Sequence, residues 1–128
     1  MNAEILARLE ALRSQPKFVD EPGTIYNGMR PEDTRRLAET QLNDLIDRLM
    51  LAPGDTPERK FVMKLFSQIL RHFPRYYETE DRERMARYIV QLAEILGIKG
   101  YHGLLTRWLY GRILGTLLLL QTRHQRAT

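Results

Sequence analysis

Apolar residues recur at helical spacing along most of this chain of 128 residues. Spacings of three and four residues place side chains on one face of an α-helix, and such a stripe marks a helix that packs against others. The stripes predict five helices, over residues 2–13, 31–51, 57–73, 79–96 and 104–121. We therefore predict an all-α fold, a single-domain bundle of about five helices over 1–128, with residues 122–128 as a frayed basic tail.

The clearest stripe lies in the third of these stretches. Its members are Phe61, Val62, Leu65, Phe66, Ile69, Leu70 and Phe73. Pro74 follows the last of them, and a proline cannot continue a helix because it lacks an amide hydrogen. We expect the three phenylalanines of this helix to lie in the core.

The helix over 79–96 has recognisable start and stop signals. Thr79 is the expected N-cap, and the acidic residues after it face the positive end of the helix dipole. These residues are Glu80, Asp81 and Glu83. Gly97 suits the left-handed conformation that ends many helices, and we expect Ile98 to fold back on the last turn as in a Schellman motif.

Residues 14–30 separate the first two helices and carry turn signals. Pro22-Gly23 and Asn27-Gly28 are dipeptides typical of tight turns. Two interpretations stay open: a small hairpin, or an ordered loop whose apolar side chains plug the helical body. Those side chains are Phe18, Ile25 and Tyr26.

The last predicted helix is apolar on more than one face, as expected for a helix central in a bundle. Gly111 and Gly115 lie four residues apart and would let the helix over 79–96 approach closely. The most apolar tract, Ile113–Leu120, is shorter than the roughly 20 residues that a membrane span needs. The N-terminal residues lack the pattern of a secretory signal, and the chain has no cysteine. We expect a cytoplasmic protein with no membrane span.

Charge is uneven along the chain, whose formal net charge is +4. Residues 95–128 contain five basic side chains and no acidic one. A basic region favours an anionic partner, but it also arises when a helix and a tail are simply solvated. Both interpretations stay open.

The sequence offers little that resembles a reaction centre. His72, His102 and His124 lie on different segments without the spacing of metal ligands. The acidic turn at the start of the helix over 79–96 is accounted for by the helix dipole. No phosphate-binding glycine loop or nucleophile elbow occurs. We expect no catalytic residue, no metal and no cofactor, and hence no enzyme.

Two stretches, TEDRERMARYIVQLAEILGI and GLLTRWLYG, together with the upstream TIYNGM, resemble a bacterial family known only as domain of unknown function 4844. The matching positions are Thr79 to Glu83, Gly97, Gly103 to Leu105, Trp108, Tyr110, Gly111, Tyr26 and Gly28. The resemblance covers about Phe18–Gly111 and leaves out the basic, leucine-rich extension beyond it. It implies an all-helical fold and a small stand-alone protein, and it carries over no catalytic residue.

We therefore expect a non-enzymatic protein–protein interaction module of the immunity or adaptor type, and a homo-oligomer stays open. Because tyrosine and arginine are enriched in protein interfaces, we choose these residues and their neighbours as a candidate contact surface. Its residues are Tyr26, Arg75, Tyr76, Tyr77, Tyr101, His102, Arg107 and Tyr110. The alternative is a nucleic-acid-binding accessory protein that uses the basic C-terminal third, since residues 71–77 interleave basic and aromatic side chains.

Overall fold

A computed structural model of the chain describes residues 1–73 and 78–110, and this part contains five helices and no strand. The first four are α1 (Ala3–Ser14), α2 (Glu32–Met50), α3 (Arg59–His72) and α4 (Thr79–Leu96). Residues 102–110 are also helical, up to the edge of the described part. The all-α prediction is confirmed, and the first four predicted helices lie within one or two residues of the observed ones.

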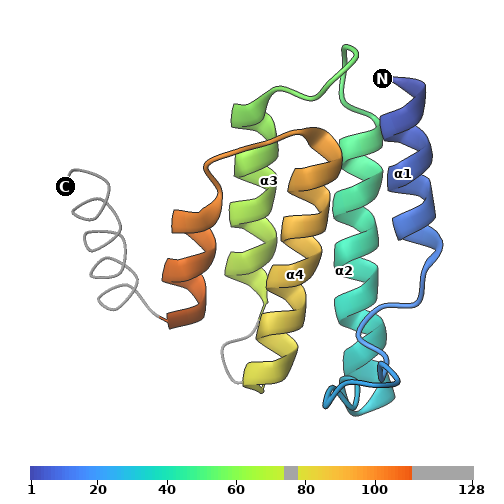
Figure 1. The fold of residues 1–128 in the computed structure, drawn as a ribbon, viewed down its shortest axis with the longest axis vertical. Coiled ribbons are helices and arrows are strands. Elements are labelled where there is room, and N and C mark those ends of the chain that lie inside the picture. Colours follow the sequence, from blue (N-terminus) through green and yellow to red (C-terminus); the bar gives the residue numbers. More distant parts are fainter. Residues whose placement is uncertain (74–77, 111–128) are drawn as a thin grey trace.

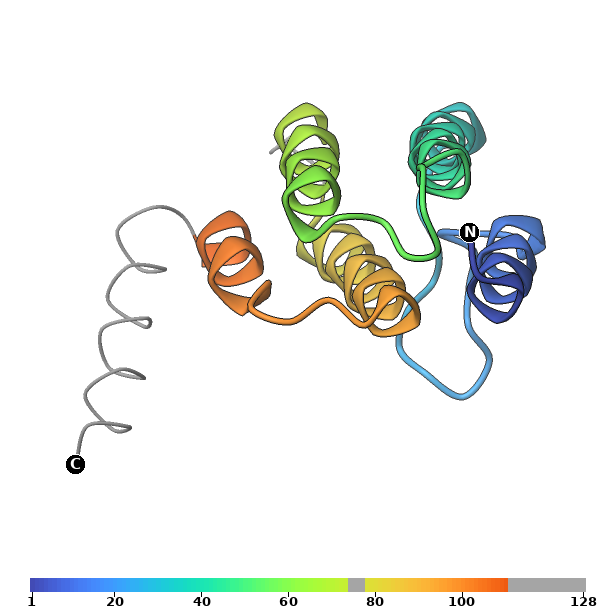
Figure 2. The ribbon, with the colours of Figure 1, turned by 90° about the horizontal axis from the view of Figure 1, so that it is seen from above.

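Successive helices run in opposite directions and form two layers (Figures 1 and 2). Seen from above, α2 and α3 make up one layer, and α1 and α4 make up the other. α1 contacts both α2 and α4, and α2 contacts α3. The helix over 102–110 lies beside α3 and α4, on the side away from α1.

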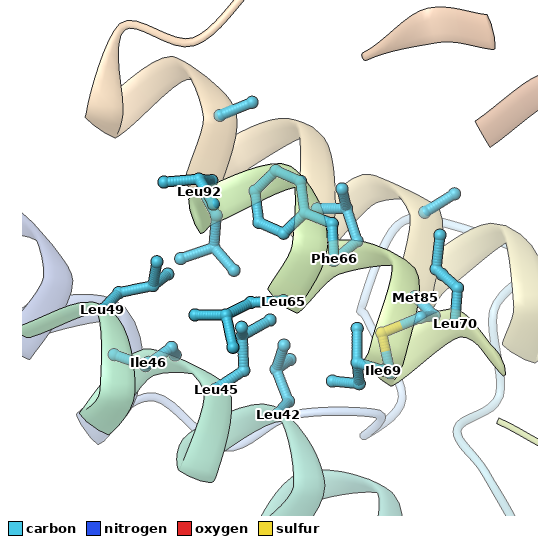
Figure 3. Packing of buried hydrophobic residues seen from close by; sticks show 14 of the residues in the cluster. Leu42, Leu45, Ile46, Leu49, Leu65, Phe66, Ile69, Leu70, Met85 and Leu92 are labelled. Atoms are coloured by element: carbon cyan, nitrogen blue, oxygen red, sulfur yellow. The ribbon is translucent and has the colours of Figure 1, made fainter. Parts of the chain in front are cut away.

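The core fills the space where α2, α3 and α4 face one another (Figure 3). Its labelled side chains are Leu42, Leu45, Ile46, Leu49, Leu65, Phe66, Ile69, Leu70, Met85 and Leu92. Each such side chain contributes about 1.5–3 kcal/mol when it leaves water completely. Phe66 and Phe73 are buried as predicted, but Phe61 is 38% exposed and the prediction for it is wrong. Phe61 lies in the first turn of α3, at the edge of the stripe that Val62 and Phe66 centre on the core.

The end of α4 confirms the predicted stop signal. Gly97 has φ +69°, and its amide donates to the carbonyl of Glu94 at 3.2 Å. The amide of Ile98 donates to the carbonyl of Ala93 at 2.8 Å, and the Ile98 side chain is buried. These are the two hydrogen bonds and the apolar contact of a Schellman motif.

The start of α4 differs from the prediction by one residue. The N-cap is Glu78, and Thr79 is already helical. The carbonyl of Glu78 accepts from the amides of Asp81 and Arg82, both at 3.1 Å, so the hydrogen-bonded turn opens one residue before Thr79. No side chain caps this helix start.

The segment between α1 and α2 is an ordered loop, which decides between the two predicted alternatives. Phe18 and Tyr26 are buried against the helices, whereas Ile25 is 89% exposed and does not plug the body. The loop closes through the amide of Met29, which donates to the carbonyl of Phe18 at 2.8 Å. Beside this bond, Gly28 has φ +84°, a conformation that L-residues rarely adopt.

Trp108 fixes the helix over 102–110 to the body. Its indole Nε1 donates to the carbonyl of Leu70 at 2.8 Å, and its ring packs edge-on against Phe73. The guanidinium of Arg82 lies 4.3 Å from the centre of the Trp108 ring.

The predicted glycine contacts at 111 and 115, the tract 113–120 and the tail 122–128 lie outside the described residues. Within residues 1–73 and 78–110, no helix has both the length and the hydrophobicity of a membrane span.

Candidate functional site

Charged side chains gather in two regions of the described structure. The first, the loop junction, comprises loop residues 15–31 and the side chains of α2 and α4 that hold them. Lys17 lies at its centre with no exposed surface. Its Nζ donates to the carbonyls of Arg13 and Gln15, both at 2.8 Å, and its pKa is lowered because burial disfavours the charged amine.

Arg35 and Glu39 of α2 bind the backbone around Lys17. The guanidinium of Arg35 donates to the carbonyl of Lys17 and to Oε2 of Glu39, both at 2.9 Å, and pairs with Glu32 at 2.8 Å. Oε2 of Glu39 also accepts from the amide of Lys17 at 2.7 Å. Burial acts to raise the pKa of Glu39, but these hydrogen bonds and the nearby positive charges outweigh it and lower that pKa.

Tyr26 and Asp81 form a second buried pair at the loop junction. The Tyr26 hydroxyl donates to Oδ1 of Asp81 at 2.8 Å, and the Asp81 residue is 8% exposed. Burial raises the pKa of Asp81 despite the hydrogen bond, and burial also raises the pKa of Tyr26. Arg84 stacks on the Tyr26 ring and pairs with Glu21 at 2.7 Å. Asp81 is therefore bonded inside the fold, and the helix dipole alone does not account for it as the sequence suggested.

Hollows surround this loop, and two of the charged groups that line them, Asp81 and Arg84, are bonded within the chain. One of about 530 Å³ is bordered by Arg30, Thr34, Glu78 and Asp81. A second hollow, of about 490 Å³, lies between the loop and α4 and includes Arg84, whose guanidinium is paired with Glu21. Because Lys17, Arg35, Glu39 and Asp81 are bonded within the chain, we interpret the loop junction as a structural element that holds α1, α2 and α4 together.

The second region is an open groove of about 340 Å³ between α2 and α3, which we call the α2–α3 groove. Leu45, Leu65 and Ile69 form its apolar floor. Figure 3 shows these three side chains close together between α2 and α3. Its polar rim consists of Gln41, Asp44, Arg48, Gln68, Arg71 and His72. The groove lies between two helices, α2 and α3, that pack against each other.

The cations along this groove differ from Lys17, Arg35 and Arg84 of the loop junction, which are bonded within the chain. α3 contains four basic residues and no acidic one. In the described part of the chain, no ion pair involves Arg48, Lys64 or Arg71. Exposed apolar side chains continue the groove at both ends, with Leu37 before Gln41 on α2, Leu51 after Arg48, and Phe61 one turn before Leu65.

The structure scatters the interaction residues that the sequence suggested. Tyr26 and Tyr101 are only 6% and 8% exposed, so as surface anchors these two were wrong. Tyr26 bonds to Asp81 in the first turn of α4, whereas Tyr101 follows the end of that helix, so the two tyrosines lie near its opposite ends. His102, Arg107 and Tyr110 are exposed on or beside the helix over 102–110. Arg75, Tyr76 and Tyr77 lie outside the described residues.

Sequence reasoning missed both charged regions for different reasons. Tyr26 and Asp81 are 55 residues apart, and nothing local signals that their side chains meet. The groove did leave a signal, because residues 59–72 contain cations off the apolar stripe and no acid. In the described residues, no group of three or more histidine, aspartate or glutamate side chains could hold a metal ion.

Comparison with known proteins gives the family. The domain of unknown function DUF4844 matches residues 1–112, and the chain belongs to that family, as the sequence resemblance indicated. The chain is also similar to the crystal structure of a DUF3571 family protein from Acinetobacter baumannii AYE, with a TM-score of 0.76 and 22% identity over 89% of this chain and 94% of that one. At this identity the likeness concerns the fold alone. None of the curated proteins matches the chain.

Proposed function

We propose that this member of the DUF4844 family is a non-enzymatic interaction module of the bacterial cytoplasm that binds another protein through the α2–α3 groove. One observation carries the proposal. The groove combines an apolar floor with rim cations, Arg48 and Arg71, that have no ion-pair partner in the described part of the chain. An apolar centre within a polar rim is the usual anatomy of a protein interface, and arginine is enriched there.

The exposed apolar residues at the groove ends support a binding surface longer than the groove itself. Leu51 is 85% exposed and Leu37 is 53% exposed, next to a floor that is already apolar. A partner that covers all three parts would remove this surface from water, at about 25 cal/mol per Å². The two concrete forms of the proposal are an immunity-type role, which blocks a toxin by binding it, and an adaptor role. Both need a rigid surface and no reaction centre.

A second candidate is nucleic-acid binding, which the acid-free charge of α3 favours. Phosphate contacts would release counterions, so the affinity would fall steeply between about 50 and 200 mM salt. The apolar floor and the carboxylate of Asp44 in the groove favour a protein over a phosphate backbone. Loss of all affinity for nucleic acid at low salt removes this candidate.

The test compares two variants in which exposed leucine or isoleucine residues are replaced by glutamate. Leu37→Glu with Leu51→Glu changes both ends of the groove, and Ile25→Glu changes a side chain of similar exposure on the loop. Full-length wild-type and variant chains are used to capture proteins from extract of the native cells, and the captured proteins are identified by mass spectrometry. We expect a specific partner that the Ile25 variant retains and the double variant loses. Equal recovery by all three chains, or recovery of chaperones alone, contradicts the proposal.

A further inference from the structure

The walls of the α2–α3 groove suit a helical occupant. α2 and α3 are antiparallel neighbours, and no other described helix covers the outer side of their layer (Figure 2). Along α2 the rim runs from Gln41 to Arg48, a rise of about 10 Å or two helical turns. A helix laid along two parallel walls presents apolar anchors at positions i, i+3 or i+4, and i+7, which matches a floor of this length.

The charges of the two walls differ, and this difference gives the occupant's chemistry. On the α3 side, Lys64, Gln68 and Arg71 follow one another at spacings of four and three residues, so they share one edge of the helix. The cations at 64 and 71 lie about 10 Å apart along the axis, the separation of carboxylates at positions i and i+7 of a facing helix. On the α2 side, the carboxylate of Asp44 stands one turn from Arg48 and would repel an acidic edge.

We infer that the α2–α3 groove accepts an amphipathic α-helix of a second protein, oriented with an acidic flank along α3 and a polar, non-acidic flank along α2. Its apolar face lies on Leu45, Leu65 and Ile69. Glutamate or aspartate side chains seven residues apart pair with Lys64 and Arg71, whose charges are unpaired in the described chain. This inference rests on the proposed function and names the class of partner.

The experiment is a selection from a displayed library of helical peptides of about 15 residues. Leucines are fixed at the anchor positions, and glutamate, glutamine and lysine are mixed at both flanks. The bait is the full chain in three forms: wild type, the charge-reversed double variant Lys64→Glu with Arg71→Glu, and the control Arg8→Glu on the exposed side of α1. Each form is first shown to have the same circular dichroism and thermal midpoint as the wild type.

Wild type and Arg8→Glu are expected to enrich peptides with glutamate on one flank only. The double variant should bind those peptides at least about tenfold more weakly and should enrich lysine on that flank instead. The inference is overturned if wild type enriches glutamine or lysine on both flanks of the peptides. It is also overturned if the double variant enriches the same flank residues as wild type. A selection in which no peptide is enriched overturns it as well.

Two further measurements distinguish other occupants. A dimer in sedimentation velocity that Lys64→Glu with Arg71→Glu dissociates would show that a second copy fills the groove. A DNA or RNA oligonucleotide that binds wild type and not the double variant would show a nucleic-acid site. Either result overturns the helical-partner inference. If the selection fails while the Leu37 and Leu51 variant still loses its captured partner, the proposed function stands and only the helical occupant is wrong.

Discussion

The loop junction and the α2–α3 groove are both rich in charge, but in the described structure the charges at the centre of the loop junction are bonded within the chain, and the arginines of the groove rim are not. At the loop junction, Lys17, Arg35 and Glu39 are buried or half-buried and bonded to one another's side chains or backbone. At the groove, Arg48 and Arg71 are exposed and form no ion pair with the described residues. The difference therefore lies in whether the chain itself supplies the partner.

The physical reason is the cost of desolvation. A charge taken out of water must be compensated by hydrogen bonds or an opposite charge, because an uncompensated buried charge is strongly destabilising. The loop junction meets this requirement internally and in return ties three helices to one loop. An exposed cation keeps its hydration and can exchange it for a partner's carboxylate. Internal pairing thus indicates a structural role, and exposed unpaired charge beside an apolar floor indicates binding.

The largest expected effect breaks the loop junction at Gly28. A Cβ at this position would lie 2.9 Å from the amide nitrogen of Asp20 and 3.2 Å from the carbonyl oxygen of Phe18, in addition to the strain of φ +84°. Because backbone atoms cannot yield as a flexible side chain can, Gly28→Ala should lower the free energy of unfolding by about 3 kcal/mol. Chemical denaturation measures it.

Gly23→Ala is the matched control. Gly23 has nearly the same φ, +87°, but nothing lies within 4 Å of a Cβ there. It should cost only the conformational strain, about 1 kcal/mol. Equal losses for the two variants would mean that the loop does not approach its neighbour closely at Gly28.

The next effect tests the ionic pairing of Glu39. Glu39→Gln removes the negative charge that holds Arg35 and the amide of Lys17, and should cost about 1–2 kcal/mol at pH 7. Since the folded-state pKa of Glu39 lies below its ordinary 4.5, the charge stabilises the fold above that pH. That stabilisation is lost as pH falls through the lowered pKa, so the gap between variant and wild type should close below about pH 4.5.

Urea denaturation at several pH values measures this gap. Glu10→Gln on α1 serves as control, because the Glu10 side chain is exposed and forms no ion pair within the described residues. A gap that is constant from pH 7 to pH 3 would show that the variant acts through packing and not through charge.

The helices were predictable because their information is local. The stripe of α3 and the Gly97 stop of α4 depend on residues within one or two turns of each other, and both were confirmed. The wrong predictions concern residues at the start of a helix or residues that make a contact distant in the sequence. Phe61 has the apolar spacing of the stripe but lies in the first turn of α3, at the edge of the core. Thr79 is a residue type that favours the N-cap position, but the first hydrogen-bonded turn opens at Glu78.

The candidate site was predictable only in part, because it depends on which helices become neighbours. The sequence shows that residues 59–72 lack acids, but not that Leu45 of α2 joins Leu65 to form a floor. Tyr26 was selected for its residue type, yet the same tyrosine serves an interface or a buried hydrogen bond equally well. Its burial follows from meeting Asp81, which no local pattern encodes.

The smallest effect sharpens the comparison at Asp81, a buried carboxylate that accepts a hydrogen bond from Tyr26 and forms no ion pair within the described residues. Burial raises the pKa of Asp81 above its ordinary 3.8, so between 3.8 and the raised value the folded chain holds a proton that the unfolded chain has lost. The free energy of unfolding therefore falls as pH rises through this window, and the full cost of the buried charge remains above it. Asp81→Asn removes that cost and can still accept the hydrogen bond from Tyr26. It should be as stable as wild type at pH 7, or more stable by up to about 1 kcal/mol, with the difference vanishing near pH 3.8.

Asp33→Asn, which changes an exposed acid in the first turn of α2, should instead lose a few tenths of a kcal/mol through the helix dipole. If both variants lose the same amount at pH 7, the charge of Asp81 acts through the helix dipole alone, and its burial carries no net cost.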